Sequence, residues 1–382
     1  MTQSEMLLDR ARQLVAPLKL QARDSRSLRR VLESTITELH DAELFKILQP
    51  KRWGGFEADL KTFYRVQSIL AEGCPSTAWV FGVVSVHSWQ LGLFELEAQN
   101  DVWAENRNAL IASSYAPTGT ARPVEGGYRV SGKWSFSSGC DNCDWIFLGA
   151  FAPEMRTMLL PASDYRIEDN WNTVGLEGTG SKDIIVEDAF VPAHRSHLLM
   201  DGFKVTSPGN EVNNGALYRI PFGQVFVRSV STTAIGIAQG AFNVFIDVAK
   251  ERIGATDKAR VALDPTAQLA CAEAKALIDD VKLRLDHNAD VLMSHANAGT
   301  IPSIETRVQF RFDSANAVRK CVEAVDLLFA ASGGRAIFRD NPIQPFFQDI
   351  HGANAHFANR TDKPLRNLGS ILLGGETTDF FL

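Results

Sequence analysis

Residues 133–145, KWSFSSGCDNCDW, lie near the middle of the chain and form its most unusual stretch. Cys140 and Cys143 have the CxxC spacing found in zinc sites and in thioredoxin-type redox sites. A structural zinc site needs four ligands, and no second half of such a site is visible in the sequence. A thioredoxin-type motif begins a helix after a strand, whereas strand-like aromatic sequence follows here. We therefore interpret both cysteines as semi-buried thiols and expect no metal site.

The region around this stretch, about 109–212, consists of short runs of β-forming residues bounded by turns. Gly126-Gly127 separates two of these runs, and the second alternates apolar and polar residues, which is typical of a β-hairpin. No pattern of helical length interrupts the runs. The sequence therefore predicts a central antiparallel β-domain, of the sandwich or barrel type, over residues 109–212.

Helical patterns lie on both sides of this region. Residues 1–108 repeat apolar side chains at helical spacing, and 77–94, TAWVFGVVSVHSWQLGLF, are apolar almost all round, which predicts a buried helix. Residues 213–382 contain long helical patterns, in which Gly236 and Gly240 allow close approach of helices. The predicted fold class is α+β, with an N-terminal α-helical domain, the β-domain and a C-terminal four-helix bundle.

Composition restricts the partners and the compartment. The chain has 382 residues, of which 45% are hydrophobic and 22% charged, and a net charge of −6, which argues against a nucleic-acid or anionic-membrane surface. No apolar run approaches the length of a bilayer span, and the N-terminal residues lack a signal-peptide core. Five cysteines are a sparse, odd set that fits reduced thiols. We expect a cytoplasmic protein without nucleic-acid or membrane partners.

The sequence resembles the acyl-CoA dehydrogenase fold over essentially its whole length. More closely, it is similar to the flavin-dependent monooxygenases of that fold, the oxygenase components of two-component aromatic hydroxylases such as p-hydroxyphenylacetate hydroxylase. The resemblance rests on five stretches in this order: LQPKRWGGFEADL (48–60), CPSTAWVFGVVSVHSWQLGLF (74–94), SSYAPTGTARPVEGGYRVSGKWSFSSGCD (113–141), WNTVGLEGTGSKDIIVEDAFVP (171–192) and DIHGANAHFANR (349–360).

This resemblance implies a reaction and its partners. Reduced FMN, with FAD possible in its place, would react with O2 to give a C4a-hydroperoxyflavin that hydroxylates a small phenol- or indole-like aromatic substrate. A separate NAD(P)H-dependent flavin reductase would supply the reduced flavin, because the sequence contains no reductase module. The alternative is an acyl-CoA dehydrogenase-type flavoenzyme that oxidises a thioester. Phe357 weakens that alternative, because it stands where such enzymes carry a glutamate base.

The resemblance also implies the residues at the flavin. His356, the second histidine of a His-x4-His pair with His351, would lie beside the ring and assist proton delivery. A hydroxyl at the end of KWSFSSG would bond flavin N5, and the sequence leaves Ser137 and Ser138 both open for this role. Trp134 would pack against the flavin ring or in the core.

Further residues are implied at the flavin phosphate and at the substrate. Arg252 and Lys258 correspond to the place where this fold binds the flavin phosphate across a subunit interface, in an expected homotetramer. The apolar segments 229–249 and 318–328 are consistent with such an assembly, because they suggest more burial than one bundle needs. The residues implied at the substrate are His87, which would orient a phenol, together with Ser113, Trp89 and Phe357.

Overall fold

The computed structural model describes all residues except 254–259 and 380–381. The helices before the sheet are α1 (Gln3–Leu28), α2 (Glu33–Asp41), α3 (Leu60–Gly73), α4 (Pro75–Leu91) and α5 (Leu96–Trp103). The strands are β1 (Ile111–Val124), β2 (Gly127–Ser137), β3 (Trp145–Phe151), β4 (Met155–Pro161), β5 (Arg166–Glu168), β6 (Lys182–Pro192) and β7 (Ser196–Leu198). The later helices are α6 (Leu199–Lys204), α7 (Gly209–Val212), α8 (Phe222–Glu251), α9 (Pro265–Asn297), α10 (Ile304–Ala331), α11 (Gln344–Asn354) and α12 (Asp362–Leu372).

The strands form one mixed sheet in the order β5-β6-β2-β1-β3-β4-β7. The predicted hairpin is confirmed, because β1 and β2 pair antiparallel with Val124 opposite Gly127. The prediction of an antiparallel domain is wrong for β1 and β3, which pair in parallel with Ile111 opposite Trp145. The reason is the path of the chain: after β2 it passes a short 3-10 turn and returns on the free side of β1, and so runs in the direction of β1.

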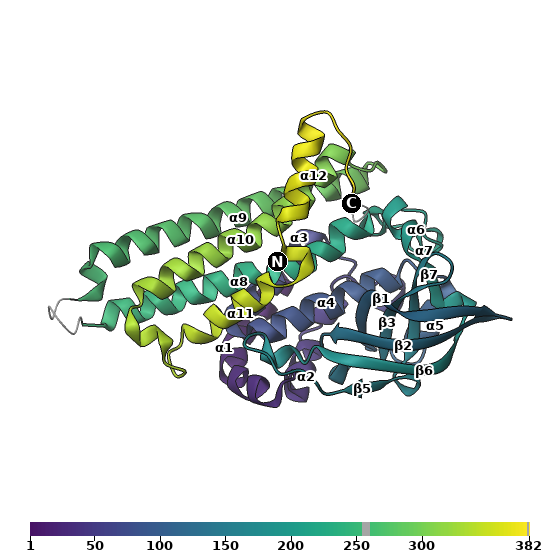
Figure 1. Ribbon diagram of the computed structural model, residues 1–382, viewed down its shortest axis with the longest axis horizontal. Coiled ribbons are helices and arrows are strands. Elements are labelled where there is room, and N and C mark those ends of the chain that lie inside the picture. The colour runs from purple at the N-terminus through teal and green to yellow at the C-terminus, as the bar shows by residue number, and fades with distance from the viewer. Residues whose placement is uncertain (254–259, 380–381) are drawn as a thin grey trace.

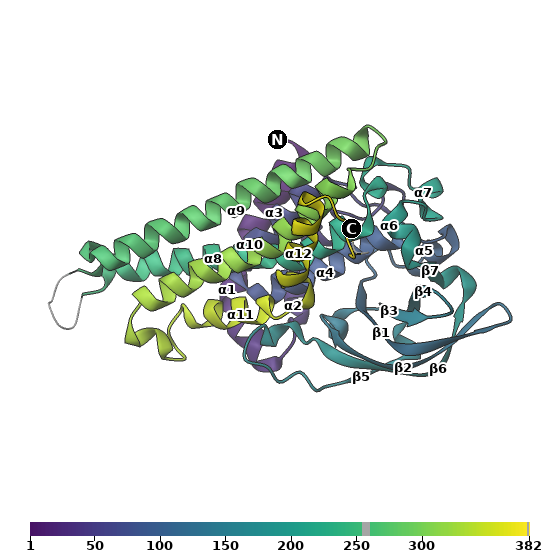
Figure 2. The same ribbon diagram turned by 45° about the horizontal axis from the view of Figure 1, so that its top comes forward.

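Helix α4 is buried along its whole length, as its apolar sequence predicts. It packs against α3 and α8 on the helical side and against β1 of the sheet. Figures 1 and 2 show the sheet at one end of the molecule, with α8, α9 and α10 extending away from it. Helix α4 therefore lies where the helices meet the sheet, and its side chains can contact both.

The helices from both ends of the chain share one apolar core, whereas most of the sheet has a core of its own. Glycines permit the close helix packing: a Cβ atom on Gly236 would lie 2.1 Å from the main-chain oxygen of Ser68 in α3. A Cβ atom on Gly240 would lie 2.3 Å from the ring of Phe346 in α11. Helix α8 has the length and composition of a bilayer span, but 78% of that window is buried inside the protein, which is typical of a core helix.

We predict that Gly236→Ala destabilises the protein. The added methyl group has no space against α3, so the free energy of unfolding, measured by urea denaturation, should fall by about 2 kcal/mol. Gly369→Ala in α12 is the matched control, because no atom lies within 4 Å of its Cβ position. Alanine favours the helix there by up to about 1 kcal/mol. Equal effects of the two substitutions would contradict the close packing of α3 and α8.

Candidate active site

The indole of Trp79 brings together two segments that are far apart in the sequence. Trp79 lies in α4 and is 5% exposed. Its Nε1 donates a hydrogen bond to Ser138 Oγ at 3.1 Å, and its ring lies 5.6 Å from the imidazole of His356 in an edge-to-face arrangement. Two residues expected at the flavin, one after β2 and one after α11, therefore meet at the same side chain of α4.

The imidazole of His356 is a neutral hydrogen-bond donor at neutral pH. Burial, and secondarily the charge of Arg311, lowers its pKa to about 4. Its Nδ1 accepts a hydrogen bond from the main-chain N–H of Ala358 at 3.2 Å. In a neutral imidazole only one nitrogen carries hydrogen, so Nε2 carries it and can donate to an oxygen atom. The other histidine of the pair, His351, is exposed and bonds to Asp326 at 3.0 Å.

The two candidate serines have different surroundings. Ser137 is fully buried, and its Oγ has no hydrogen-bond partner among the described residues. Ser138 is half-buried, and its Oγ bonds to Trp79 and, at 2.7 Å, to Ser181 Oγ. Only Ser138 is joined to the indole that also contacts His356.

A second polar group, His87, lies eight residues after Trp79 on α4, about 12 Å along the helix axis. Its ring is fully buried, and burial lowers its pKa to about 4. Nδ1 lies 2.5 Å from the main-chain oxygen of Ile111. A carbonyl oxygen only accepts, so Nδ1 carries the hydrogen and Nε2 is left as an acceptor. Among the described residues, Nε2 has no partner.

Aromatic side chains surround His87, at ring distances between 5.7 and 6.4 Å: Tyr115, Phe147 and Phe226. The Tyr115 hydroxyl donates to Gln90 Oε1, and the side chain of Ser113 lies close to it. The sequence analysis missed Tyr115, although it lies two residues after Ser113 in a strand, where alternate residues share a face. It also missed Trp79, which shares the apolar helix of His87.

The two predicted tryptophans are core residues. Trp89 is fully buried, donates to the main-chain oxygen of Leu217 at 3.0 Å and stacks on Phe222. Phe222 in turn contacts Tyr115, so Trp89 is separated by one ring from the cluster around His87. Trp134 is fully buried in the core of the sheet and donates to the main-chain oxygen of Gly149 at 2.8 Å. For Trp134 this matches the second of the two expected positions, the core.

The remaining predicted residues lie apart from one another. Phe357 is 62% exposed, and its ring lies 4.8 Å from that of His356. Arg252 follows the last turn of α8 and donates to the main-chain oxygen of Ser332, at the end of the bundle away from the sheet (Figure 1). One chain therefore does not bring Arg252 to Trp79. Lys258 lies outside the described residues.

The CxxC cysteines are buried or half-buried thiols. The Sγ of Cys140 lies 3.7 Å from the main-chain oxygen of Gly180. Burial raises the pKa of Cys140 to about 12 and that of Cys143 well above its usual value, so both are protonated at neutral pH. In the part of the chain that the structure describes, no group of histidine, cysteine and carboxylate side chains is placed to hold a metal ion.

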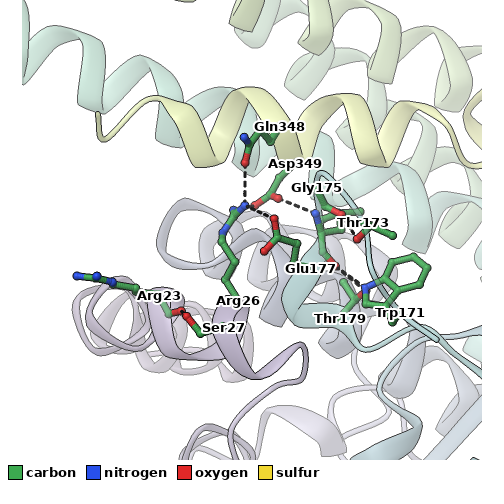
Figure 3. A network of polar contacts seen from close by, with 11 residues as sticks. Arg23, Arg26, Ser27, Trp171, Thr173, Gly175, Glu177, Thr179, Gln348 and Asp349 are labelled. Carbon is green, nitrogen blue, oxygen red and sulfur yellow. Dashed lines mark hydrogen bonds and ion pairs between the residues drawn. The ribbon is translucent and has the colours of Figure 1, made fainter. Parts of the chain in front are cut away.

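A network of charged groups fixes the loop 171–181 against α11 (Figure 3). Arg26 of α1 donates to Gln348 Oε1 and to Asp349 Oδ2, each at 3.0 Å. The other oxygen of Asp349 accepts from the main-chain N–H of Leu176 at 2.7 Å. Asp349 is 1% exposed, and burial raises its pKa. The buried carboxylate therefore connects α1, α11 and the loop that leads to Ser181.

Comparison with known proteins defines the class to which this fold and site belong. The family model of the acyl-CoA dehydrogenase C-terminal domain matches residues 229–361. The oxygenase subunit HsaA of a flavin-dependent monooxygenase from Rhodococcus jostii (strain RHA1) is 36% identical over 375 residues, covering 96% of this chain and 98% of that protein. The oxygenase component of an FADH(2)-dependent resorcinol hydroxylase from Rhizobium sp. (strain MTP-10005) is 34% identical and covers 93% of this chain and 91% of its own.

A solved structure agrees with these relatives. The crystal structure of 3-HSA hydroxylase from Rhodococcus sp. RHA1 superposes with a TM-score of 0.95 at 35% identity, and the match covers 98% of each chain. The fold is thus that of the acyl-CoA dehydrogenases. The chain belongs to the flavin-dependent monooxygenases that serve as oxygenase components of two-component aromatic hydroxylases, and the predicted enzyme class is confirmed.

The residues around Trp79 fit a reduced flavin. A flavin ring has apolar faces and a polar edge, so its site needs an aromatic wall and hydrogen-bonding groups side by side. Trp79 supplies the aromatic group, and Ser138 and His356 supply half-buried polar atoms in contact with it.

We predict that Asp349→Ala destabilises the protein by about 2 kcal/mol, because the N–H of Leu176 loses its acceptor inside the fold. The measurement is the free energy of unfolding from urea denaturation. His351→Ala is the control on the same helix: it removes an exposed ion pair, which contributes less than about 1 kcal/mol. If Asp349→Ala were as mild as His351→Ala, the network would not stabilise the fold.

Proposed function

We propose that this oxygenase component hydroxylates a phenol-like ring, with the buried His87 and the half-buried His356 in opposite roles. The observation that carries the proposal is a pair of neutral imidazoles at two points along α4: His356, against Trp79, with Nε2 as donor, and His87, about two turns further along the helix, with Nε2 as acceptor. When bound, the reduced flavin supplies the electrons that activate O2. The protein must then control hydrogen bonding and proton position at two places: at the activated oxygen (the oxygen side) and at the substrate hydroxyl (the substrate side).

His356 acts on the oxygen side. Its Nε2–H can donate a hydrogen bond to an oxygen atom beside Trp79, and its pKa of about 4 keeps it neutral through the physiological range. A neutral donor stabilises a partly charged oxygen without releasing a full proton to it, which favours retention of the oxygen over loss as hydrogen peroxide. Phe357, next to it, is apolar and cannot act as the base of a thioester dehydrogenase.

His87 acts on the substrate side. Its Nε2 is a buried acceptor without a partner, and such an atom is costly unless a ligand donates to it. A phenol O–H meets this requirement, and the hydrogen bond makes the ring more electron-rich and so more reactive toward an electrophilic oxygen. The N–H of an indole-like ring is the second candidate donor. The rings of Tyr115, Phe147 and Phe226 provide apolar surroundings for an aromatic substrate.

The flavin and its source complete the proposal. We assign reduced FMN, because the arginine-phenylalanine-glycine signature of the fold is absent from the sequence. The relative named as FADH(2)-dependent makes reduced FAD the competing assignment, and anaerobic titration with each flavin distinguishes them. A separate NAD(P)H-dependent reductase delivers the reduced flavin, as the names oxygenase subunit and oxygenase component imply for the relatives.

The test uses the purified protein with reduced FMN, O2 and either phenol or its methyl ether, anisole. We expect hydroxylated product from phenol and little from anisole, because only phenol donates to His87. His87→Phe should lower the yield of phenol product at least about tenfold and raise the release of hydrogen peroxide. The surface variant His351→Phe should behave as wild type. Equal conversion of phenol and anisole, or full activity of His87→Phe, would contradict this role.

We also propose the homotetramer expected from the resemblance, but on a different surface from the one that the sequence suggested. The segments 229–249 and 318–328 are buried mainly within the chain itself, in the core of α8 and α10, so they are not free to form an interface. A groove of about 530 Å3 lies instead between α9 and α10. On its border, Leu283 is 72% exposed. We assign this face to contact with a second copy of the chain.

We predict a mass near four times 42.0 kDa in light scattering. Leu283→Arg should lower the assembly state, because it replaces the exposed apolar side chain on the border of this groove by a longer, charged one. Phe151→Arg is the matched control, at a ring that is 62% exposed at the end of β3. A wild-type monomer at micromolar concentration, or an unchanged tetramer in Leu283→Arg, would contradict this assignment.

A further inference from the structure

The hydroxyl of Ser138 is the last member of a chain of hydrogen-bonded groups. The chain starts at the main-chain oxygen of Leu176, which lies 2.8 Å from Thr179 Oγ1. Ser181 Oγ lies 2.7 Å from Thr179 Oγ1. Ser138 Oγ in turn lies 2.7 Å from Ser181 Oγ, and the Nε1 of Trp79 lies 3.1 Å from Ser138 Oγ. Thr179 and Ser181 are both buried, so these hydroxyls find their partners inside the protein.

The direction of every hydrogen bond in this series is determined by the main-chain oxygen of Leu176, at which the series begins. A carbonyl oxygen can only accept, so Thr179 must donate its single hydroxyl hydrogen to Leu176. Thr179 Oγ1 therefore accepts from Ser181, and Ser181 Oγ accepts from Ser138. The indole N–H of Trp79 can only donate, so it donates to Ser138. Ser138 Oγ has then used its one hydrogen and one lone pair, and its remaining lone pair can only accept.

The first acceptor is held in place by the network of Figure 3. Leu176 has a positive φ of 51°, which is unfavourable for a leucine and persists only where the surroundings enforce it. Its N–H donates to the buried Asp349, which is bonded to Arg26. Its carbonyl also accepts from the indole of Trp171 at 3.2 Å. The loop therefore cannot turn this carbonyl away from Thr179 without breaking several bonds.

We propose that Thr179 and Ser181 are positioning residues that make Ser138 an obligate acceptor, so that the site selects reduced over oxidised flavin. This inference rests on the proposed function, in which Ser138 lies at the flavin. Reduced flavin carries a hydrogen on N5 and can donate it, whereas N5 of oxidised flavin has a lone pair and needs a donor. A hydroxyl that can only accept forms a hydrogen bond with the N5–H of reduced flavin. At oxidised flavin, its lone pair would face the lone pair of N5 and no hydrogen bond would form. Neither positioning residue touches the flavin; both act through Ser138.

The test compares the affinities of reduced and oxidised FMN in anaerobic titrations, without turnover. The wild type should bind reduced FMN more tightly. In Thr179→Val the hydrogen of Ser181 is free to turn to Ser138, and Ser138 can then donate to oxidised N5. The ratio of the two dissociation constants should therefore shift by about tenfold toward oxidised FMN. Ser181→Ala breaks the same chain at its middle member and should shift the ratio in the same direction.

Three controls separate polarity from loss of packing. Thr179→Ser keeps the hydroxyl and should restore the wild-type ratio. Thr157→Val makes the same change at a buried threonine in β4, whose Oγ1 has no partner among the described residues, and should leave the ratio unchanged. Ser137→Ala should also leave it unchanged. If Thr179→Val does not fold, as judged by thermal unfolding, Ser181→Ala gives the answer, because it only removes atoms.

The outcomes distinguish this inference from the function on which it rests. A wild-type protein that binds no reduced flavin overturns both. A wild type that prefers reduced FMN, with the same preference in Thr179→Val and Ser181→Ala, overturns the inference alone. If the ratio of the two dissociation constants shifts in Ser137→Ala but not in Thr179→Val, the contact with flavin N5 belongs to Ser137. That result also overturns the inference.

Discussion

The burial of helix α4 on all sides is the constraint on which the rest of the site depends. A helix enclosed by α3, α8 and the sheet exposes none of its polar side chains to water, so each must find a partner within the protein or in a ligand. Trp79 bonds to Ser138, and His87 bonds to the main chain of β1. Packing of this one helix thereby sets the spacing between the two parts of the site.

The two histidines show how the main chain can give one residue type two functions. Burial lowers both pKa values to about 4, so neither ring is charged at neutral pH. The difference lies in the first partner of Nδ1, which is a carbonyl oxygen for His87 and an N–H for His356. These partners select opposite tautomers, and so one Nε2 accepts while the other donates. In the loop 171–181, a main-chain oxygen likewise determines which way the hydroxyls of Thr179 and Ser181 donate.

The fold itself does not decide between a dehydrogenase and an oxygenase, since both chemistries occur on it. In the function proposed for this chain, the difference lies in a few residues after α11. Phe357 provides no base, and His356 provides a neutral hydrogen-bond donor next to Trp79. The strong matches to oxygenase subunits agree with that local chemistry.

The sequence by itself determined the order of helical and β regions, the buried helix around His87 and the family, because these depend on local periodicity and on motifs. It also singled out His356 and the pair Ser137 and Ser138 as candidates for the flavin site. Only the tertiary structure decided the parallel pairing of β1 with β3, the partnership of Ser138 with Trp79, and the tautomers of the two histidines. These features join residues far apart along the chain, and no local pattern encodes which main-chain group will meet a buried side chain.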